Sequence, residues 1–158
     1  MFTVISILLV IFFLLMNAFF VIAEFALVRV RKSQIELAVE EKKPGARAAK
    51  KIAENINAYL SACQLGITLA SLAIGWLGEP AVSAVLEMPL LAAGLPESTI
   101  YPICVGVGFF IVTTLHVVVG ELIPKSFAIF STEKYALATA GPLALFYKIT
   151  YPFMWLFN

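Results

Sequence analysis

Residues 3–28 read TVISILLVIFFLLMNAFFVIAEFALV, an apolar stretch in which Asn17 and Glu24 are the only amide or ionisable side chains. Because a helix of about 20 apolar residues crosses the hydrocarbon core of a bilayer, this stretch predicts a transmembrane helix. A secretory signal is disfavoured, since no basic residue precedes the stretch, its apolar run exceeds a signal's short core and no small-x-small cleavage pattern follows. We therefore expect a retained helix at residues 1–30.

The composition of the whole chain also indicates lipid as its main solvent. Its 158 residues are 61% hydrophobic and 13% charged, and the mean hydropathy is +0.96, outside the range of soluble globular domains. The net charge of +1 argues against a nucleic-acid partner held by a broad basic field. Cys63 and Cys104 both fall in apolar segments, where we expect small core residues and neither a disulfide nor a metal pair.

Two further apolar stretches predict two more transmembrane helices. The expected fold is therefore an all-α membrane protein with three transmembrane helices plus juxtamembrane helices. Gly78-Glu79-Pro80 is interpreted as the end of the second helix, and later prolines as breaks in the connector. The expected segments are a first transmembrane helix at 1–30, a cytoplasmic helical loop at 31–57, a second transmembrane helix at 58–78, an extracellular connector at 79–99, a third transmembrane helix at 100–130 and juxtamembrane helices at 131–158.

Basic residues are concentrated in one of the two expected loops. Residues 29–57 contain eight Lys or Arg and four Glu, whereas residues 79–99 contain three Glu and no basic residue. The positive-inside rule then places the first loop in the cytoplasm and the second outside. For a multi-pass protein of the cell membrane with three spans, this predicts an external N-terminus and a cytoplasmic C-terminus.

Two segments outside the expected spans also have predicted conformations. Lys43-Pro44-Gly45 predicts a turn between two short helices in the first loop. Residues 135–158 are apolar and aromatic, but this segment also contains Pro142, Lys148 and Pro152. That pattern favours a helix lying along the membrane interface over one that crosses the bilayer.

The candidates for ionisable side chains at bilayer depth are Glu24, His116, Glu121 and Lys125. An ionisable side chain costs roughly 2.5–3.5 kcal/mol at the bilayer centre, so each calls for a partner. Glu24 lies two helical turns after Asn17 on the same face, although it is also near enough to Arg29 to sit at the interface instead. His116 is interpreted as a hydrogen-bonded packing residue in preference to an ion ligand.

The second expected helix has one continuous face of small and polar residues, spaced three and four apart: Ser61, Gln64, Thr68, Ser71 and Gly75. We name this face the polar stripe. It fits helix packing through hydroxyl groups, and equally an ion site that the intramembrane carboxylates would complete.

The third expected helix contains the sequence GELIPK at residues 120–125. Pro124 has no amide hydrogen, so the carbonyl of Gly120 loses its helical partner. Glu121 follows directly, which places a backbone oxygen and a carboxylate together at a weakened, π-bulged turn. The alternative for Glu121 is an ion pair with Lys125 one turn later on the same helix.

The Gly120 carbonyl and the Glu121 carboxylate are both hard oxygen donors. Such donors match Mg²⁺, Na⁺ or Ca²⁺ better than zinc or copper. Irregular backbone at membrane depth is tolerated where it lines a cavity, and transporters use such backbone to coordinate ions. The residues therefore predict a cation site inside the membrane.

Three motifs in order carry a family resemblance: NAFFVIAEFAL at 17–27, QLGITLAS at 64–71 with WLGEP at 76–80, and GELIPK at 120–125. From about residue 10 to 158, the chain resembles the transmembrane domain of the CorC/CNNM family of magnesium transporters. The resemblance implies a homodimer, belt-like juxtamembrane helices and an inward-open acidic cavity for Mg²⁺, exchanged for Na⁺. It also implies cytoplasmic CBS domains in the full-length protein, which are absent from this chain.

Carried over by position, the resemblance implies a metal site made of Asn17, Glu24, Ser71, Gly120 and Glu121. Several relatives have serines where this chain has Val21 and Ala23, so any ligand from that turn would be a backbone carbonyl. The expected function is Mg²⁺ transport, as Na⁺-coupled export.

Two other functions are alternatives to transport. One is a dimerising membrane anchor for cytoplasmic regulatory domains, which explains the polar stripe but leaves the GELIPK turn without a purpose. The other is an intramembrane enzyme, which lacks support because no nucleophile with a nearby base and no pair of metal-binding histidines is present. We therefore expect no enzymatic activity.

Overall fold

A computed structural model describes residues 2–157 of the chain, and its elements are all helices. In chain order they are α1 (Phe2–Arg29), α2 (Lys32–Glu40), α3 (Ala46–Glu54), α4 (Ile56–Ala92), α5 (Glu97–Leu115), the π-helix η1 (His116–Leu122), α6 (Ile123–Phe130) and α7 (Thr132–Phe157). No strand occurs within the described residues, which confirms the all-α prediction.

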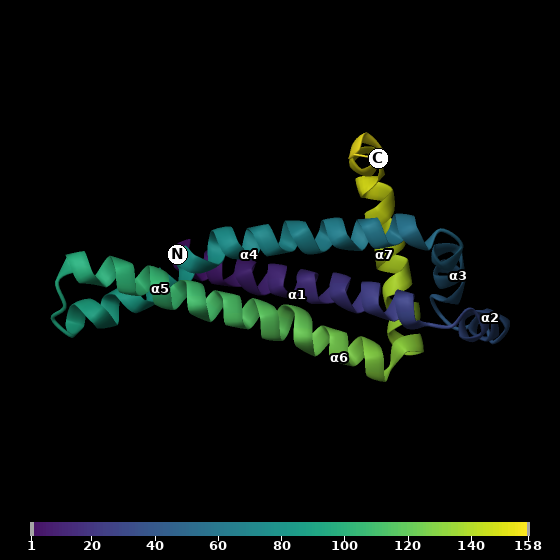
Figure 1. Cartoon of the computed structure of the whole chain (residues 1–158), viewed down its shortest axis with the longest axis horizontal. Coiled ribbons are helices and arrows are strands. Elements are labelled where there is room, and N and C mark those ends of the chain that lie inside the picture. The colour runs from purple at the N-terminus through teal and green to yellow at the C-terminus, as the bar shows by residue number, and fades with distance from the viewer. Residues whose placement is uncertain (1, 158) are drawn as a thin grey trace.

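Three long helical segments run side by side and form an elongated bundle (Figure 1). By length and composition, three segments are able to cross a membrane: Thr3–Arg29, Ile56–Ala92 and Glu97–Phe130. The third consists of α5, η1 and α6 in continuous succession. The prediction of three candidate transmembrane helices is therefore confirmed.

The second span ends later than its sequence predicts. We expected a helix end at Gly78-Glu79-Pro80 and an irregular connector to residue 99, but α4 continues through Pro80 and Pro89 to Ala92. Gly78 is instead a close-packing position, since an added Cβ would lie 2.6 Å from the Val112 side chain on α5. Packing against α5 supports a helix that its prolines weaken, and the connector shrinks to the turn at residues 93–96.

The helices α2, α3 and α7 gather at one end of the bundle, and we call these three helices the belt (Figure 1). As predicted, α2 and α3 are short and flank the Lys43-Pro44-Gly45 turn. The helix α7 runs transverse to the long helices (Figure 1), a course that agrees with the predicted placement along the membrane interface. It stays helical through Pro142 and Pro152.

The main hydrophobic core lies between the belt, the C-terminal half of α1 and the start of α4. Its fully buried members include Ala23, Ile52, Cys63 and Leu143. A smaller core joins the three long helices. Cys63 and Cys104 are buried free thiols, so their prediction as core residues is confirmed.

Large apolar side chains point outward along the long helices, as lipid contact requires. Trp76 on α4 is 80% exposed, and Phe109 and Phe110 on α5 are 67% and 70% exposed. In water such an extensive apolar surface would cause aggregation, so the fold by itself defines a membrane protein.

Candidate functional site

The distinctive feature of the third span is its π-helical turn. Across η1 the amide of Ile123 bonds to the carbonyl of Val118, five residues earlier. Pro124 follows at the start of α6, is fully buried, and has no amide hydrogen to give to Gly120. The predicted π-bulged turn is therefore confirmed, and it leaves the Gly120 carbonyl available to another helix.

Asn17 on α1 uses this carbonyl. Its Nδ2 atom donates a hydrogen bond of 2.9 Å to the Gly120 carbonyl oxygen, and the side chain is fully buried. Its Oδ1 atom accepts a 3.3 Å bond from the Ser71 hydroxyl on α4. One amide side chain thus links all three spans, which places backbone, amide and hydroxyl oxygens within a single polar cluster.

His116, at the start of η1, completes this cluster. Its Nε2 atom lies 3.1 Å from the Ser71 hydroxyl oxygen. A hydroxyl has one proton, so when Ser71 donates to Asn17 it accepts from the Nε2–H group of His116. The predicted hydrogen bond of His116 is present, although its partner could not be read from the sequence.

The cluster has no space beside Gly120 for a larger residue. A Cβ added there would lie 3.0 Å from Asn17 Nδ2 and 3.0 Å from His116 Cδ2. Both distances are tighter than ordinary contacts between a Cβ and its neighbours. Glycine therefore allows α1 and η1 to approach closely enough for the Asn17 bond.

The Glu121 carboxylate points to Lys125 in this structure. The Lys125 ammonium lies 3.1 Å from Oε2 of Glu121, and about a third of each side chain is exposed. The same ammonium lies 5.3 Å from the centre of the Phe25 ring on α1, a cation–π contact. The intrahelical ion pair considered as an alternative is thus present, beside the polar cluster in sequence but outside its hydrogen bonds.

Glu24 lies apart from the cluster. It is seven residues after Asn17 on α1, which is a rise of about 10 Å along a helix. Its side chain is half-buried and has no hydrogen bond or salt bridge within residues 2–157. The structure therefore brings Asn17, Ser71 and Gly120 together and leaves both predicted carboxylates outside their hydrogen-bonded cluster.

The polar stripe of α4 contributes only Ser71 to the cluster. The hydroxyls of Ser61 and Thr68 donate to the carbonyls of Asn57 and Gln64 on their own helix. Ser61, Gln64, Thr68 and Gly75 are exposed on the protomer. Most of the stripe thus remains free for contact with another helix.

The donor chemistry suits a hard ion. No group of three or more His, Cys, Asp or Glu side chains is close enough to hold a metal within the described part of the chain. The clustered oxygens come from an amide, a hydroxyl and a backbone carbonyl, with Glu121 adjacent in sequence. Such neutral oxygens and one or two carboxylates match Mg²⁺, Ca²⁺ or Na⁺, whereas thiolate and imidazole sites select softer metals.

The fold and the polar cluster define a helical membrane protein with an unusual interhelical site at a π-turn. Comparison with known families is more specific, because residues 8–158 match the family described as the Cyclin M transmembrane N-terminal domain. The chain belongs to this family, which confirms the resemblance seen in its motifs.

Several relatives share most of this sequence. UPF0053 protein YugS of Bacillus subtilis (strain 168) is 49% identical over 138 residues, covering 87% of this chain and 32% of the relative. UPF0053 protein YhdT of the same organism is 46% identical over 143 residues, covering 90% and 31%. An uncharacterized protein of Mycobacterium tuberculosis (strain ATCC 25618 / H37Rv), Rv1841c, is 34% identical, covering 90% and 40%. The chain spans about a third of the length of such relatives.

Proposed function

We propose that this protein transports Mg²⁺ across the cell membrane, as an exporter coupled to Na⁺. The observation that supports the proposal best is the polar cluster, in which α1, α4 and η1 meet at a backbone carbonyl freed by Pro124. Burying an amide, a hydroxyl and an imidazole among apolar helices is costly in lipid, and such groups mark ion pathways in membrane proteins. A simple anchor does not need them.

The cluster suggests how an ion is bound. In this structure Asn17 Nδ2 donates a hydrogen bond to the Gly120 carbonyl. Rotation of the amide by half a turn would instead present Oδ1 to a cation bound beside that carbonyl. Ser71 would supply a hydroxyl oxygen. Glu121 would supply negative charge on release from Lys125, whose ammonium would keep its cation–π contact with Phe25. Glu24, two turns along α1, would provide a second carboxylate.

The same donors are compatible with coupling to Na⁺. Na⁺ and Mg²⁺ both prefer oxygen ligands, but Mg²⁺ carries twice the charge and keeps its waters more tightly. A site with few formal charges can exchange the two ions when the carboxylates change partners. An inward-open acidic cavity would then load Mg²⁺ from the cytoplasm, and an external Na⁺ supply would displace it.

A second function, a dimerising membrane anchor, is supported by a different observation. The exposed part of the polar stripe gives α4 a face of small and polar residues that lipid does not favour, and such faces pair in membrane dimers. We propose that the protein is a homodimer under either function. In the full-length protein, cytoplasmic CBS domains would follow this membrane domain.

Ion titration of the detergent-purified protein distinguishes transport from anchoring. A ligand that binds only the folded form raises its melting temperature, and the rise grows with the ligand concentration relative to the Kd. We expect Mg²⁺ to stabilise the protein in calorimetry and thermal unfolding, with Na⁺ competing. Reconstituted vesicles should then lose Mg²⁺ faster under an opposing Na⁺ gradient. If no cation stabilises the protein or crosses the vesicle membrane, the anchor function is the correct one.

A further inference from the structure

A polar cavity lies at the belt, remote in sequence from the π-turn. It has a volume of about 760 Å³ and is formed by α3, the start of α4 and the second half of α7. Its polar and aromatic lining consists of Lys51, Asn55, Tyr59, Tyr147, Lys148 and Tyr151. No acidic residue lines it among the described residues.

The two lysines of this cavity lack a countercharge in the protein. Within residues 2–157, neither Lys51 nor Lys148 has a carboxylate oxygen within 4.0 Å. Both side chains are exposed. Lys51 lies on α3 and Lys148 on α7, so the tertiary fold brings these two distant residues to one cavity. The cavity therefore has a local charge of about +2 that an anionic ligand would neutralise.

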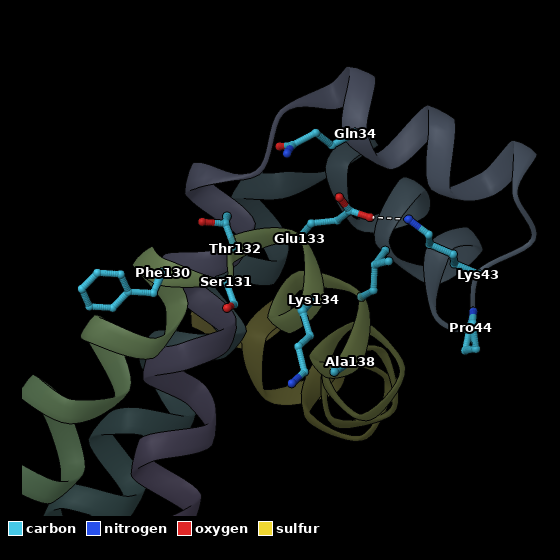
Figure 2. A pocket seen from close by; sticks show the side chains of 10 residues that line it. Gln34, Lys43, Pro44, Phe130, Ser131, Thr132, Glu133, Lys134 and Ala138 are labelled. Atoms are coloured by element: carbon cyan, nitrogen blue, oxygen red, sulfur yellow. Dashed lines mark hydrogen bonds and ion pairs between the residues drawn. The ribbon is translucent and has the colours of Figure 1, made fainter.

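Another cavity, of about 780 Å³, contains a lysine that is paired with a carboxylate of the protein (Figure 2). There Lys43 lies 2.8 Å from Glu133 and 2.9 Å from Glu41, so its charge is already neutralised inside the protein. The hydrogen bond that Lys43 donates to the Glu133 carboxylate holds the pKa of Lys43 above its ordinary value. Within the described residues, the Lys51–Lys148 cavity differs from it in having two unpaired lysines and no lining carboxylate, whereas Glu133 lines the other cavity together with Lys43 and the unpaired Lys134.

The aromatic lining provides a platform beside these charges. The rings of Tyr59 and Tyr147 lie 4.4 Å apart, and those of Tyr147 and Tyr151 lie 5.8 Å apart. Tyrosines with one apolar and one polar end gather where membrane meets water. Within the described residues no hydrogen bond joins these three hydroxyls to a protein group, so they are free to bond a ligand.

The cavity also adjoins an apolar surface. Leu145 lines it and is 62% exposed, and Ile149 one turn later on α7 is 65% exposed. A ligand seated here would have its charged part beside two lysines and an apolar part along α7. Basic pockets of this kind at helix ends bind the head groups of anionic lipids.

We propose that this cavity binds the phosphate head group of an anionic phospholipid. Lys51 and Lys148 would pair with the phosphate, the tyrosine hydroxyls and the Asn55 amide would bond its oxygens, and the acyl chains would follow Leu145 and Ile149. Such a lipid would join α3 and α4 to α7 at the membrane surface. The inference is independent of the proposed ion transport.

The test compares two double variants with the same loss of charge on the same helices. Lys51→Gln with Lys148→Gln removes both cavity lysines, whereas Lys50→Gln with Lys134→Gln removes two exposed lysines that line other cavities. Each protein, and the unaltered one, is titrated in neutral detergent with short-chain phosphatidylglycerol, short-chain phosphatidylcholine or glycerol phosphate. Thermal unfolding reports binding, and native mass spectrometry counts the bound lipids.

We expect phosphatidylglycerol to stabilise the unaltered protein and the control variant with affinities within twofold of each other. The cavity variant should bind on the order of tenfold more weakly, since each basic residue near a membrane surface attracts anionic lipid appreciably. Equal weakening in both variants would mean general surface attraction, and stabilisation by glycerol phosphate alone would mean a water-soluble ligand. Either result, or no preference for phosphatidylglycerol over phosphatidylcholine, overturns the proposal.

Discussion

Asn17 donates a 2.9 Å hydrogen bond to the carbonyl of Gly120, a residue 103 positions later in the chain. The bond exists because Pro124 cannot donate to that carbonyl, and because Gly120 has no side chain to hold α1 away. Four features of the sequence thus meet at one point: an amide, a glycine, a proline and a π-turn. Each can be altered separately.

Asn17→Ala should destabilise the protein by about 1–3 kcal/mol, because it leaves the Gly120 carbonyl and the Ser71 hydroxyl without their shared partner. Thermal unfolding in detergent measures the change. The matched control is Asn57→Ala on α4, whose side chain is exposed. A loss of stability no larger than that of the control would show that the Asn17 bonds contribute nothing.

Glu121→Gln should lower Mg²⁺ affinity at least tenfold with little change in melting temperature, because the amide keeps the shape of the side chain but removes its charge. Calorimetry measures the affinity. The control, Lys125→Met, breaks the same 3.1 Å ion pair from its other end and leaves the carboxylate free. It should bind Mg²⁺ as well as the unaltered protein or better.

These two variants also decide between the two roles of Glu121. If the carboxylate is only a structural partner of Lys125, both variants should lose stability and neither should alter Mg²⁺ binding. If it binds the ion, their effects on affinity have opposite signs.

Pro124→Ala should weaken Mg²⁺ binding, because residue 124 would gain an amide hydrogen able to reclaim the Gly120 carbonyl from Asn17. Regaining this bond favours the helix, while truncation of the fully buried proline ring removes packing, so we expect only a small net change in stability. Gly120→Val is the complementary variant, since it keeps the π-turn and crowds Asn17 and His116. Unchanged Mg²⁺ affinity in both variants would remove the Gly120 carbonyl from the site.

Gly45→Ala should destabilise the contact between α3 and α7 by more than about 1 kcal/mol, measured by thermal unfolding. Gly45 has a φ of +79°, and an added Cβ would overlap the Leu137 carbonyl. Gly94 has a φ of +78° but nothing within 4 Å of its Cβ position, so Gly94→Ala tests the backbone strain alone. Equal losses of stability in Gly45→Ala and Gly94→Ala would show that α7 moves to accommodate the methyl group at residue 45.

The sidedness of the loops is tested by cysteine labelling in a background with Cys63 and Cys104 changed to serine. A cysteine at Lys50, exposed on α3, should react with a membrane-impermeant reagent only from the cytoplasmic side. A cysteine at Pro96, exposed in the turn between α4 and α5, should react only from outside. Labelling of both positions from one face would contradict the three-span topology.

Local sequence was sufficient for the features that depend on neighbouring residues. The apolar run at residues 3–28 determined a membrane helix, since only a helix satisfies all the backbone hydrogen bonds of a membrane segment within that segment. The proline at position 124 predicted the π-turn, which the structure contains. The three motifs predicted the family, which the comparison with known families confirms.

Tertiary packing decided where helices end and which polar groups meet. Gly78 and Pro80 looked like a helix end, yet α5 packs against Gly78 and α4 continues to Ala92. Helical spacing likewise grouped Ser71 with the polar stripe, although only Ser71 turns toward Asn17 and His116. Periodicity specifies the face on which a residue lies, but the partner of that face depends on how the helices pack. That is why the sequence determined the membrane helices and the π-turn, and only the fold decided that Asn17 and Gly120 form a bond.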